Sequence, residues 1–162
     1  MGGSAWEVTQ LEYDEYSLSR RAVGPIREVL ESIPASARAH QHLVKAWNQL
    51  AGRNPDESGA YREAVKAVEA AAKPVILPEN DRATLGQMIA ALRDGPDKWT
   101  VTIGAVADVQ RSMEIVWKSQ LDRHGTDDKS VPFSVSPAEV DAAFSICLNL
   151  SRLFAGGHIQ QA

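Results

Sequence analysis

The sequence predicts an all-α protein, an up-and-down bundle of about six helices. Apolar residues recur at helical spacing along most of the 162 residues. No alternating apolar and polar run with hairpin turns appears beyond the first dozen residues, and short polar segments separate the periodic stretches. Helices joined by short loops bury their apolar stripes most simply against antiparallel neighbours, so a bundle is expected.

Composition and charge are those of one soluble domain. The chain is 44% hydrophobic and 23% charged, with a formal net charge of −4. Proteins that coat nucleic acid through bulk charge are usually strongly basic, so this class is disfavoured, although a local basic site remains allowed. The single Cys147 forms no internal disulfide, and the sequence has neither zinc-finger spacing nor an apolar run long enough for a membrane span. A cytoplasmic protein without cofactor, metal or membrane association is predicted.

Two helices are expected before Gly52. The first ends before Pro34, and the second is capped by Ser36 and stops at Gly52. Their apolar positions lie three or four residues apart, which places them on one face of each helix. These positions are Val23, Ile26, Leu30 and Ile33 in the first helix and Leu43, Ala46, Trp47 and Leu50 in the second.

A third, alanine-rich helix follows. Asn54 is its expected cap, with Pro55 at the first helical position and acids in the first turn, and Pro74 is expected to break its end. Small side chains on one stripe allow a neighbouring helix to approach closely, so this helix should be central to the bundle. The stripe consists of Ala64, Val68, Ala71 and Val75.

The fourth and fifth helices follow a loop. Thr84 and Gln87 form a capping box that begins the short fourth helix. The fifth is expected from Trp99 to Leu121, where about 23 residues would span about 34 Å at 1.5 Å per residue. The apolar residues of the fourth helix are Leu85, Met88, Ile89 and Leu92.

The last helix has the clearest beginning in the chain. Ser136 is the cap, Pro137 takes the first position and Glu139 completes a capping box, while Gly156 and Gly157 end the helix. The predicted organisation is a partly irregular N-terminal extension over 1–20, a helical domain over 21–157 and a C-terminal tail over 158–162.

Four segments together resemble one known family. They are His42–Trp47, Tyr61–Lys73, Ala83–Gly86 and the triplet Arg123, His124 and Gly125 before a last helix. They are similar to the C-terminal helical domain of AbiJ-type bacterial abortive-infection proteins, in the HEPN-like superfamily. The resemblance covers about residues 20 to 157. It implies a HEPN-like homodimer acting in phage defence or a toxin–antitoxin system, with RNA and a neutralising antitoxin or fused N-terminal domain as partners.

The resemblance also implies a reaction. Many HEPN proteins are metal-independent endoribonucleases that use an arginine and a histidine separated by four to six residues. Histidine can move a proton near neutral pH, and arginine offers a planar fork of donors to the charge that develops on phosphate. Arg123 and His124 are the expected catalytic residues, but here they are adjacent. Consecutive helical positions lie about 100° apart, so a shared target requires the helix to end or unwind here.

Other side chains are expected to be accessory or to line the cleft. Glu69 and Lys73 have the spacing of an i,i+4 ion pair on a solvated helix face. In several HEPN domains, however, a polar residue of such a helix lies beside the Arg/His site, so the pair is also a candidate to line the cleft. Trp117 lies less than two turns before Arg123 and fits a packing role as well, and Lys118 follows it. His42 fits a helix-face or interface position.

The same triplet also fits a purely structural role. A basic residue and a histidine before glycine compensate the dipole at a helix C-terminus and allow the chain to turn. The alternative function is therefore a non-catalytic dimerisation, RNA-binding or sensor module that controls a partner domain or protein.

Overall fold

The computed structural model describes residues 5–10, 16–22, 24–34, 37–124 and 135–162, apart from the side chains of residues 9, 10, 17 and 119–124. Within these ranges the chain forms six α-helices and two small two-stranded sheets, which confirms the expected all-α bundle. The helices are α1 Pro25–Glu31, α2 Arg38–Ala51, α3 Glu57–Ile76, α4 Leu85–Asp94, α5 Val106–His124 and α6 Pro137–Ala155, with a short 3-10 helix η1 Pro96–Lys98. The strands are β1 Trp6–Gln10, β2 Tyr16–Arg20, β3 Trp99–Val101 and β4 Ile159–Gln161.

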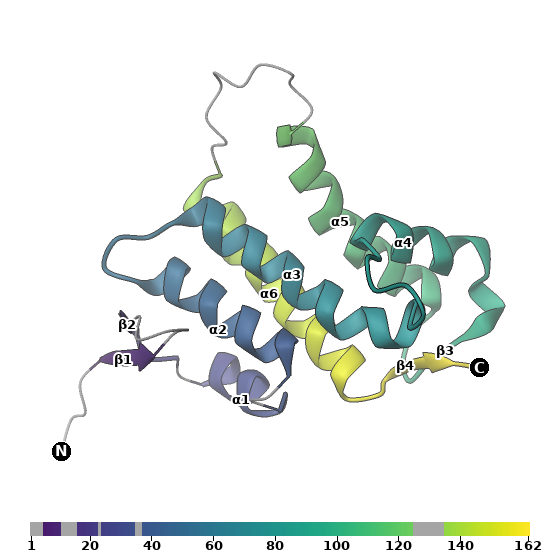
Figure 1. Ribbon diagram of the computed structural model, residues 1–162, viewed down its shortest axis with the longest axis horizontal. Helices are drawn as coiled ribbons and strands as arrows, with labels where there is room; N and C mark the ends of the chain where they lie inside the picture. The colour runs from purple at the N-terminus through teal and green to yellow at the C-terminus, as the bar shows by residue number, and fades with distance from the viewer. Residues whose placement is uncertain (1–4, 11–15, 23, 35–36, 125–134) are drawn as a thin grey trace.

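Helix α3 is the centre of the bundle, as its small residues predicted. It packs against α2 and α6, and also contacts α4 and β4; Figure 1 shows α2, α3 and α6 running alongside one another, with α4 and α5 at one end. Ala64 and Val68 are fully buried, whereas Ala71 and Val75 are only partly buried. Because helices cover α3 on more than one side, the buried face is wider than the predicted stripe. It includes Ala60, Ala67 and Ala72, which are also fully buried.

Both predicted capping boxes are present. The Thr84 hydroxyl accepts from the Gln87 amide at the start of α4, and the Ser136 hydroxyl accepts from the Glu139 amide at the start of α6. The cap of α3 was predicted two residues too early. Asp56, rather than Asn54, accepts the N–H of Gly59 at 2.8 Å.

Pro74 does not end α3. The helix continues to Ile76, and the Leu77 amide donates to the Lys73 carbonyl at 3.0 Å. A proline within the last turn removes only one helical hydrogen bond, so the turn tolerates it. The α2 cap position is Ala37, without a side-chain hydrogen bond; Val23 and Ser36 lie outside the described residues.

The sequence prediction places the start of the fifth helix too early, at Trp99. Residues Trp99–Val101 form β3, which pairs antiparallel with β4, and α5 begins only at Val106. The β-branched residues after Trp99 favour a strand over a helical turn. Strand β4 lies in the segment predicted to be a tail, and its Ile159 is buried in the core.

The N-terminal hairpin has its polar face inward. Ser19 of β2 is fully buried, and its hydroxyl donates to Asn48 Oδ1 of α2 at 2.6 Å. The opposite face carries Val8 and Leu18 as directly paired residues, with exposed fractions of 68% and 44%, and Tyr16 with 61%. This is the reverse of the usual half-buried sheet, in which the apolar face packs on the core.

Candidate functional site

The predicted catalytic pair lies at the end of α5. Arg123 and His124 are the last two residues of this helix, so the backbone remains helical through both. At 3.6 residues per turn, their positions are separated by about 100° around the helix axis. Their side chains, and Gly125 after them, lie outside the described residues. The helix stop predicted at Gly125 therefore lies outside the described residues as well.

Helix α5 is anchored in the bundle less than two turns before the pair, at Val116 and Trp117. The Tyr61 hydroxyl of α3 donates to the Val116 carbonyl at 2.7 Å. The Trp117 ring lies against Gly86 of α4 so closely that a Cβ at Gly86 would meet a ring carbon at 2.9 Å. Trp117 is therefore a packing residue of the α4–α5 contact. Lys118 is exposed, with its Nζ 3.8 Å from Glu114 Oε2.

Glu69 and Lys73 do not pair with each other. Glu69 Oε1 accepts the backbone N–H of Leu85 at 2.9 Å, and Lys73 Nζ donates to the carbonyl of Asp81 at 3.2 Å. Both side chains are half-buried and hold the connection between α3 and α4 onto α3. The expectation of a solvated i,i+4 pair was therefore wrong, because the following loop offers both side chains backbone partners.

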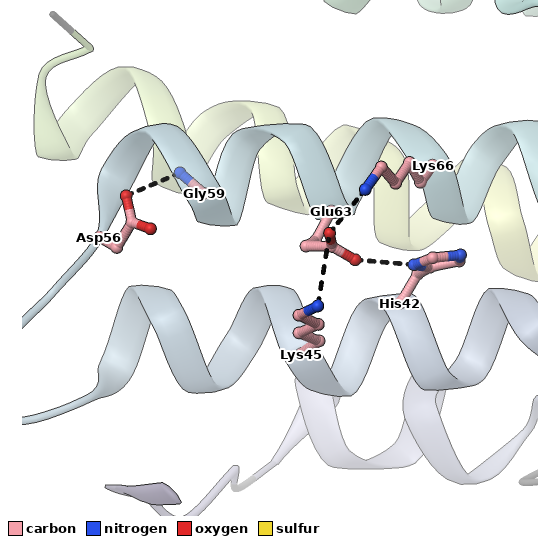
Figure 2. A network of polar contacts seen from close by, with 6 residues as sticks. All are labelled: His42, Lys45, Asp56, Gly59, Glu63 and Lys66. Carbon is pink, nitrogen blue, oxygen red and sulfur yellow. Dashed lines mark hydrogen bonds and ion pairs between the residues drawn. The ribbon is translucent and has the colours of Figure 1, made fainter. Parts of the chain in front are cut away.

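A charged cluster between α2 and α3 was missed by the sequence prediction. Glu63 of α3, whose side chain is only 7% exposed, lies at its centre (Figure 2). Its Oε2 is 2.7 Å from Nδ1 of His42, and its Oε1 is 2.9 Å from Lys66 Nζ and 3.8 Å from Lys45 Nζ. Three groups that can carry positive charge thus surround one buried carboxylate.

The cluster keeps Glu63 ionised. Burial raises the pKa of Glu63, but the hydrogen bonds from Lys66 and His42, together with the positive charges of Lys66 and Lys45, outweigh it and place this pKa below its usual value. The hydrogen bond to Glu63 engages Nδ1 of His42, so Nε2 is the ring nitrogen left for other contacts. The cluster joins α2 to α3 and orients His42.

The local sequence contains only a weak indication of this charged cluster. Lys66 lies three residues after Glu63, a spacing that indicates a surface ion pair on a helix. The side chain of Glu63 is nevertheless only 7% exposed, because α2 packs against α3, and His42 and Lys45 come from that other helix. Tyr61, two positions earlier, reaches α5 instead, so the cluster and α5 lie on different sides of α3.

We expect Glu63→Gln to destabilise the fold by about 1.5 to 3 kcal/mol, the contribution of hydrogen bonds to a charged group. The amide keeps the shape but loses the charge that binds Lys66 and His42. Urea unfolding at neutral pH measures the loss. Glu31→Gln, which breaks an exposed pair with Arg27, is the matched control and should change the midpoint far less.

The same substitution has a predicted pH dependence. The pKa of Glu63 is lowered in the folded protein, so its contribution is complete above the usual value of 4.5 and is lost as the pH falls through the lowered value. The difference in unfolding free energy between the wild type and Glu63→Gln should therefore shrink under acid conditions. A difference that is constant down to strongly acid pH would contradict an ionised Glu63.

Neither a nucleophilic cysteine nor a metal site has support among the described residues. Burial raises the pKa of the Cys147 thiol to about 12, so this residue is a packing group rather than a nucleophile. The described part of the chain contains no group of three His, Cys, Asp or Glu side chains arranged to hold a metal ion. Among the described helices, none is both long and apolar enough to cross a membrane.

Comparison with family models, with curated proteins and with solved structures finds no match for this chain.

Proposed function

We propose that this chain is a HEPN-like domain of the abortive-infection type, which cleaves RNA without a metal through Arg123 and His124. The observation that carries the proposal is the position of this pair as the last two residues of the long, anchored helix α5. The resemblance of His42–Gly86 to AbiJ-type proteins supports the same assignment. The expected setting is the cytoplasm, in phage defence, with a neutralising antitoxin or a fused domain as partner.

Each residue has one task in the proposed reaction. His124 accepts the proton of an RNA 2′-hydroxyl, whose oxygen attacks the adjacent phosphorus. The bond to the 5′-oxygen breaks, and that oxygen takes a proton from water, which leaves a 2′,3′-cyclic phosphate and a 5′-hydroxyl, while His124 releases its proton to the solvent. Arg123 donates to the phosphate oxygens, where negative charge increases in the transition state. Protons and charge balance without a redox partner.

The proposed site is shared between two chains. Positions 123 and 124 lie about 100° apart on a continuous helix, so one phosphate is reached more easily by Arg123 of one protomer and His124 of the other. A two-fold dimer then contains two identical sites. In this arrangement each protomer of the expected homodimer contributes one catalytic residue to each site.

The test is expression of the wild type and His124→Ala, followed by growth and RNA 3′ ends. We expect the wild type to arrest growth and to produce cyclic phosphate ends in the presence of EDTA. His124→Ala should lower cleavage by about 10²- to 10⁴-fold, the usual contribution of a positioned acid–base group. His158→Ala is the matched control, because His158 is exposed beside Thr102 near the C-terminus.

Equal growth and intact RNA for the wild type and His124→Ala would overturn the nuclease proposal. The second candidate would then be favoured, a non-catalytic dimerisation, RNA-binding or sensor module controlling a partner. One observation supports this alternative: the outward face of the hairpin exposes Val8, Tyr16 and Leu18 together. Contiguous exposed apolar side chains are typical of interaction surfaces.

A further inference from the structure

His42 directs one edge of its imidazole ring away from the charged cluster. Its Nδ1 lies 2.7 Å from Glu63 Oε2, and 32% of the His42 side chain is exposed. Figure 2 shows the ring edge that holds Nε2 pointing away from Glu63. Within the described residues, Nδ1 is the ring nitrogen that forms a hydrogen bond. The Nε2 atom is therefore held in a fixed direction and is open to a reacting group.

Glu63 determines which nitrogen of His42 holds the proton. Burial raises the pKa of Glu63, but hydrogen bonds from Lys66 and His42 and the charges of both lysines place this pKa below its usual value. An ionised carboxylate only accepts hydrogen bonds, so the proton of a neutral His42 ring lies on Nδ1. Nε2 then carries a lone pair, and a neighbouring carboxylate that orients the ring is typical of a nucleophilic or proton-accepting histidine.

Three basic side chains lie around His42. Arg38 precedes it by four residues on α2 and Lys45 follows it by three, and both spacings place side chains on one helix face. Lys66 comes from α3, where its Nζ is 2.9 Å from Glu63 Oε1. All three residues are exposed, so their charged ends can turn towards an anion bound at His42.

The other histidines whose side chains are described have different surroundings. His40 Nδ1 lies 3.1 Å from two backbone carbonyl oxygens, and His158 Nδ1 lies 3.3 Å from the Thr102 hydroxyl. Neither of them pairs with a carboxylate in the described part of the chain, as His42 does. An imidazole that is oriented by a carboxylate and flanked by cations is therefore specific to His42 among these histidines.

We propose that His42 Nε2 accepts a phosphoryl group from a phosphoramidate, a donor that carries phosphorus on nitrogen. The Nε2 lone pair attacks the phosphorus, the P–N bond breaks, and the protonated donor nitrogen leaves as an amine with the bonding electrons. The Nδ1 proton stays in the hydrogen bond to Glu63, which stabilises the positive charge that the ring acquires. Charge is conserved, and no oxidant or reductant is required.

The basic side chains stabilise the phosphorylated ring. A phosphoryl group adds a charge of about −1.5 to −2 at neutral pH and three acceptor oxygens, which cations nearby can bind. Arg38 offers a planar fork to two of these oxygens, and Lys45 and Lys66 offset the negative charge of Glu63. The inference does not depend on RNA cleavage at α5, because α5 lies on a different side of α3 from the cluster.

The test is incubation of the full chain with potassium phosphoramidate, followed by intact mass and phosphorus NMR at alkaline pH, where phosphohistidine persists. We expect one phosphoryl group that maps to His42 and is released by mild acid. His42→Gln should lose this group and keep a wild-type circular dichroism spectrum, because its amide can still donate to Glu63. His158→Gln is the matched control and should keep the group, since His158 is exposed outside the cluster.

A second variant tests the part played by the cations. Arg38→Gln should be phosphorylated about tenfold more slowly, the equivalent of one lost charge-assisted hydrogen bond, and should lose the group faster once the donor is removed. Arg152→Gln, which removes an exposed arginine of α6, should match the wild type in both rates. Absence of an acid-labile phosphoryl group on the wild type would overturn the proposal. Equal rates for His42 and His158 would do so as well, since they would indicate that exposure alone decides the reaction.

Discussion

Mixing Arg123→Ala chains with His124→Ala chains is expected to restore RNA cleavage that neither variant shows alone. In a two-fold dimer with sites shared between protomers, each mixed dimer contains one intact and one doubly defective site. Random exchange makes half of the dimers mixed, so activity should recover to about a quarter of the wild-type value. Cyclic phosphate ends released from a short RNA after co-expression of the two variants measure the recovery.

The control replaces the His124→Ala chain with one that carries both substitutions. Mixed dimers then contain no intact site, so activity should stay at the level of the single variants. Recovery in this control would indicate contamination rather than complementation. No recovery in the main mixture, with an active wild type, would show that Arg123 and His124 act within one chain.

We expect Arg123→Lys to lower the RNA cleavage proposed for this chain, measured as cyclic phosphate ends. Lysine at position 123 keeps the positive charge but lacks the planar fork that bonds two phosphate oxygens. Arg111 lies on the exposed side of the same helix, so Arg111→Lys serves as the matched comparison. Comparing the two variants separates the hydrogen bonding of the arginine fork at position 123 from the general electrostatic attraction of RNA.

Local sequence signals predicted the helices well. The two capping boxes act through contacts between near neighbours along the chain, and both are present in the structure. The small residues of α3 predicted its central place, which its contacts with α2 and α6 confirm. The start of α5 was harder to predict from the sequence. Residues Trp99–Val101 become a strand because Ile159–Gln161, 58 to 62 positions later, pairs with them. That pairing leaves no local periodic pattern, since each strand has only three residues.

The charged cluster was hidden for the same reason. Glu63 has the sequence neighbourhood of a solvated helix residue, and only the approach of α2 buries it beneath His42 and Lys45. Glu69 and Lys73 show the converse, because a spacing typical of an ion pair is overridden by backbone groups of the following loop. Polar side chains are therefore the part of a helical bundle that local spacing predicts least well.

The largest loss of stability is expected from Phe144→Ala. Phe144 of α6 is 1% exposed and packs against Trp47 of α2. Replacing a buried aromatic ring with a methyl group removes its burial energy and leaves a cavity, at a cost of about 3 to 5 kcal/mol. Domains of this size have a total stability of about 5 to 15 kcal/mol, so a large part would be lost. Urea unfolding followed by circular dichroism measures the change.

Ser145→Ala separates packing from helix propensity. Ser145 is the next residue of α6 and is exposed, with its hydroxyl donating to the Asp141 carbonyl. Alanine is the better helix former, so this variant should stay within about 0.5 kcal/mol of the wild type. Phe144→Ala should also shift the Trp47 emission to longer wavelength, because the indole loses its aromatic neighbour and gains water. Equal unfolding midpoints for the two variants would contradict the packing of α6 on α2 through Phe144 and Trp47.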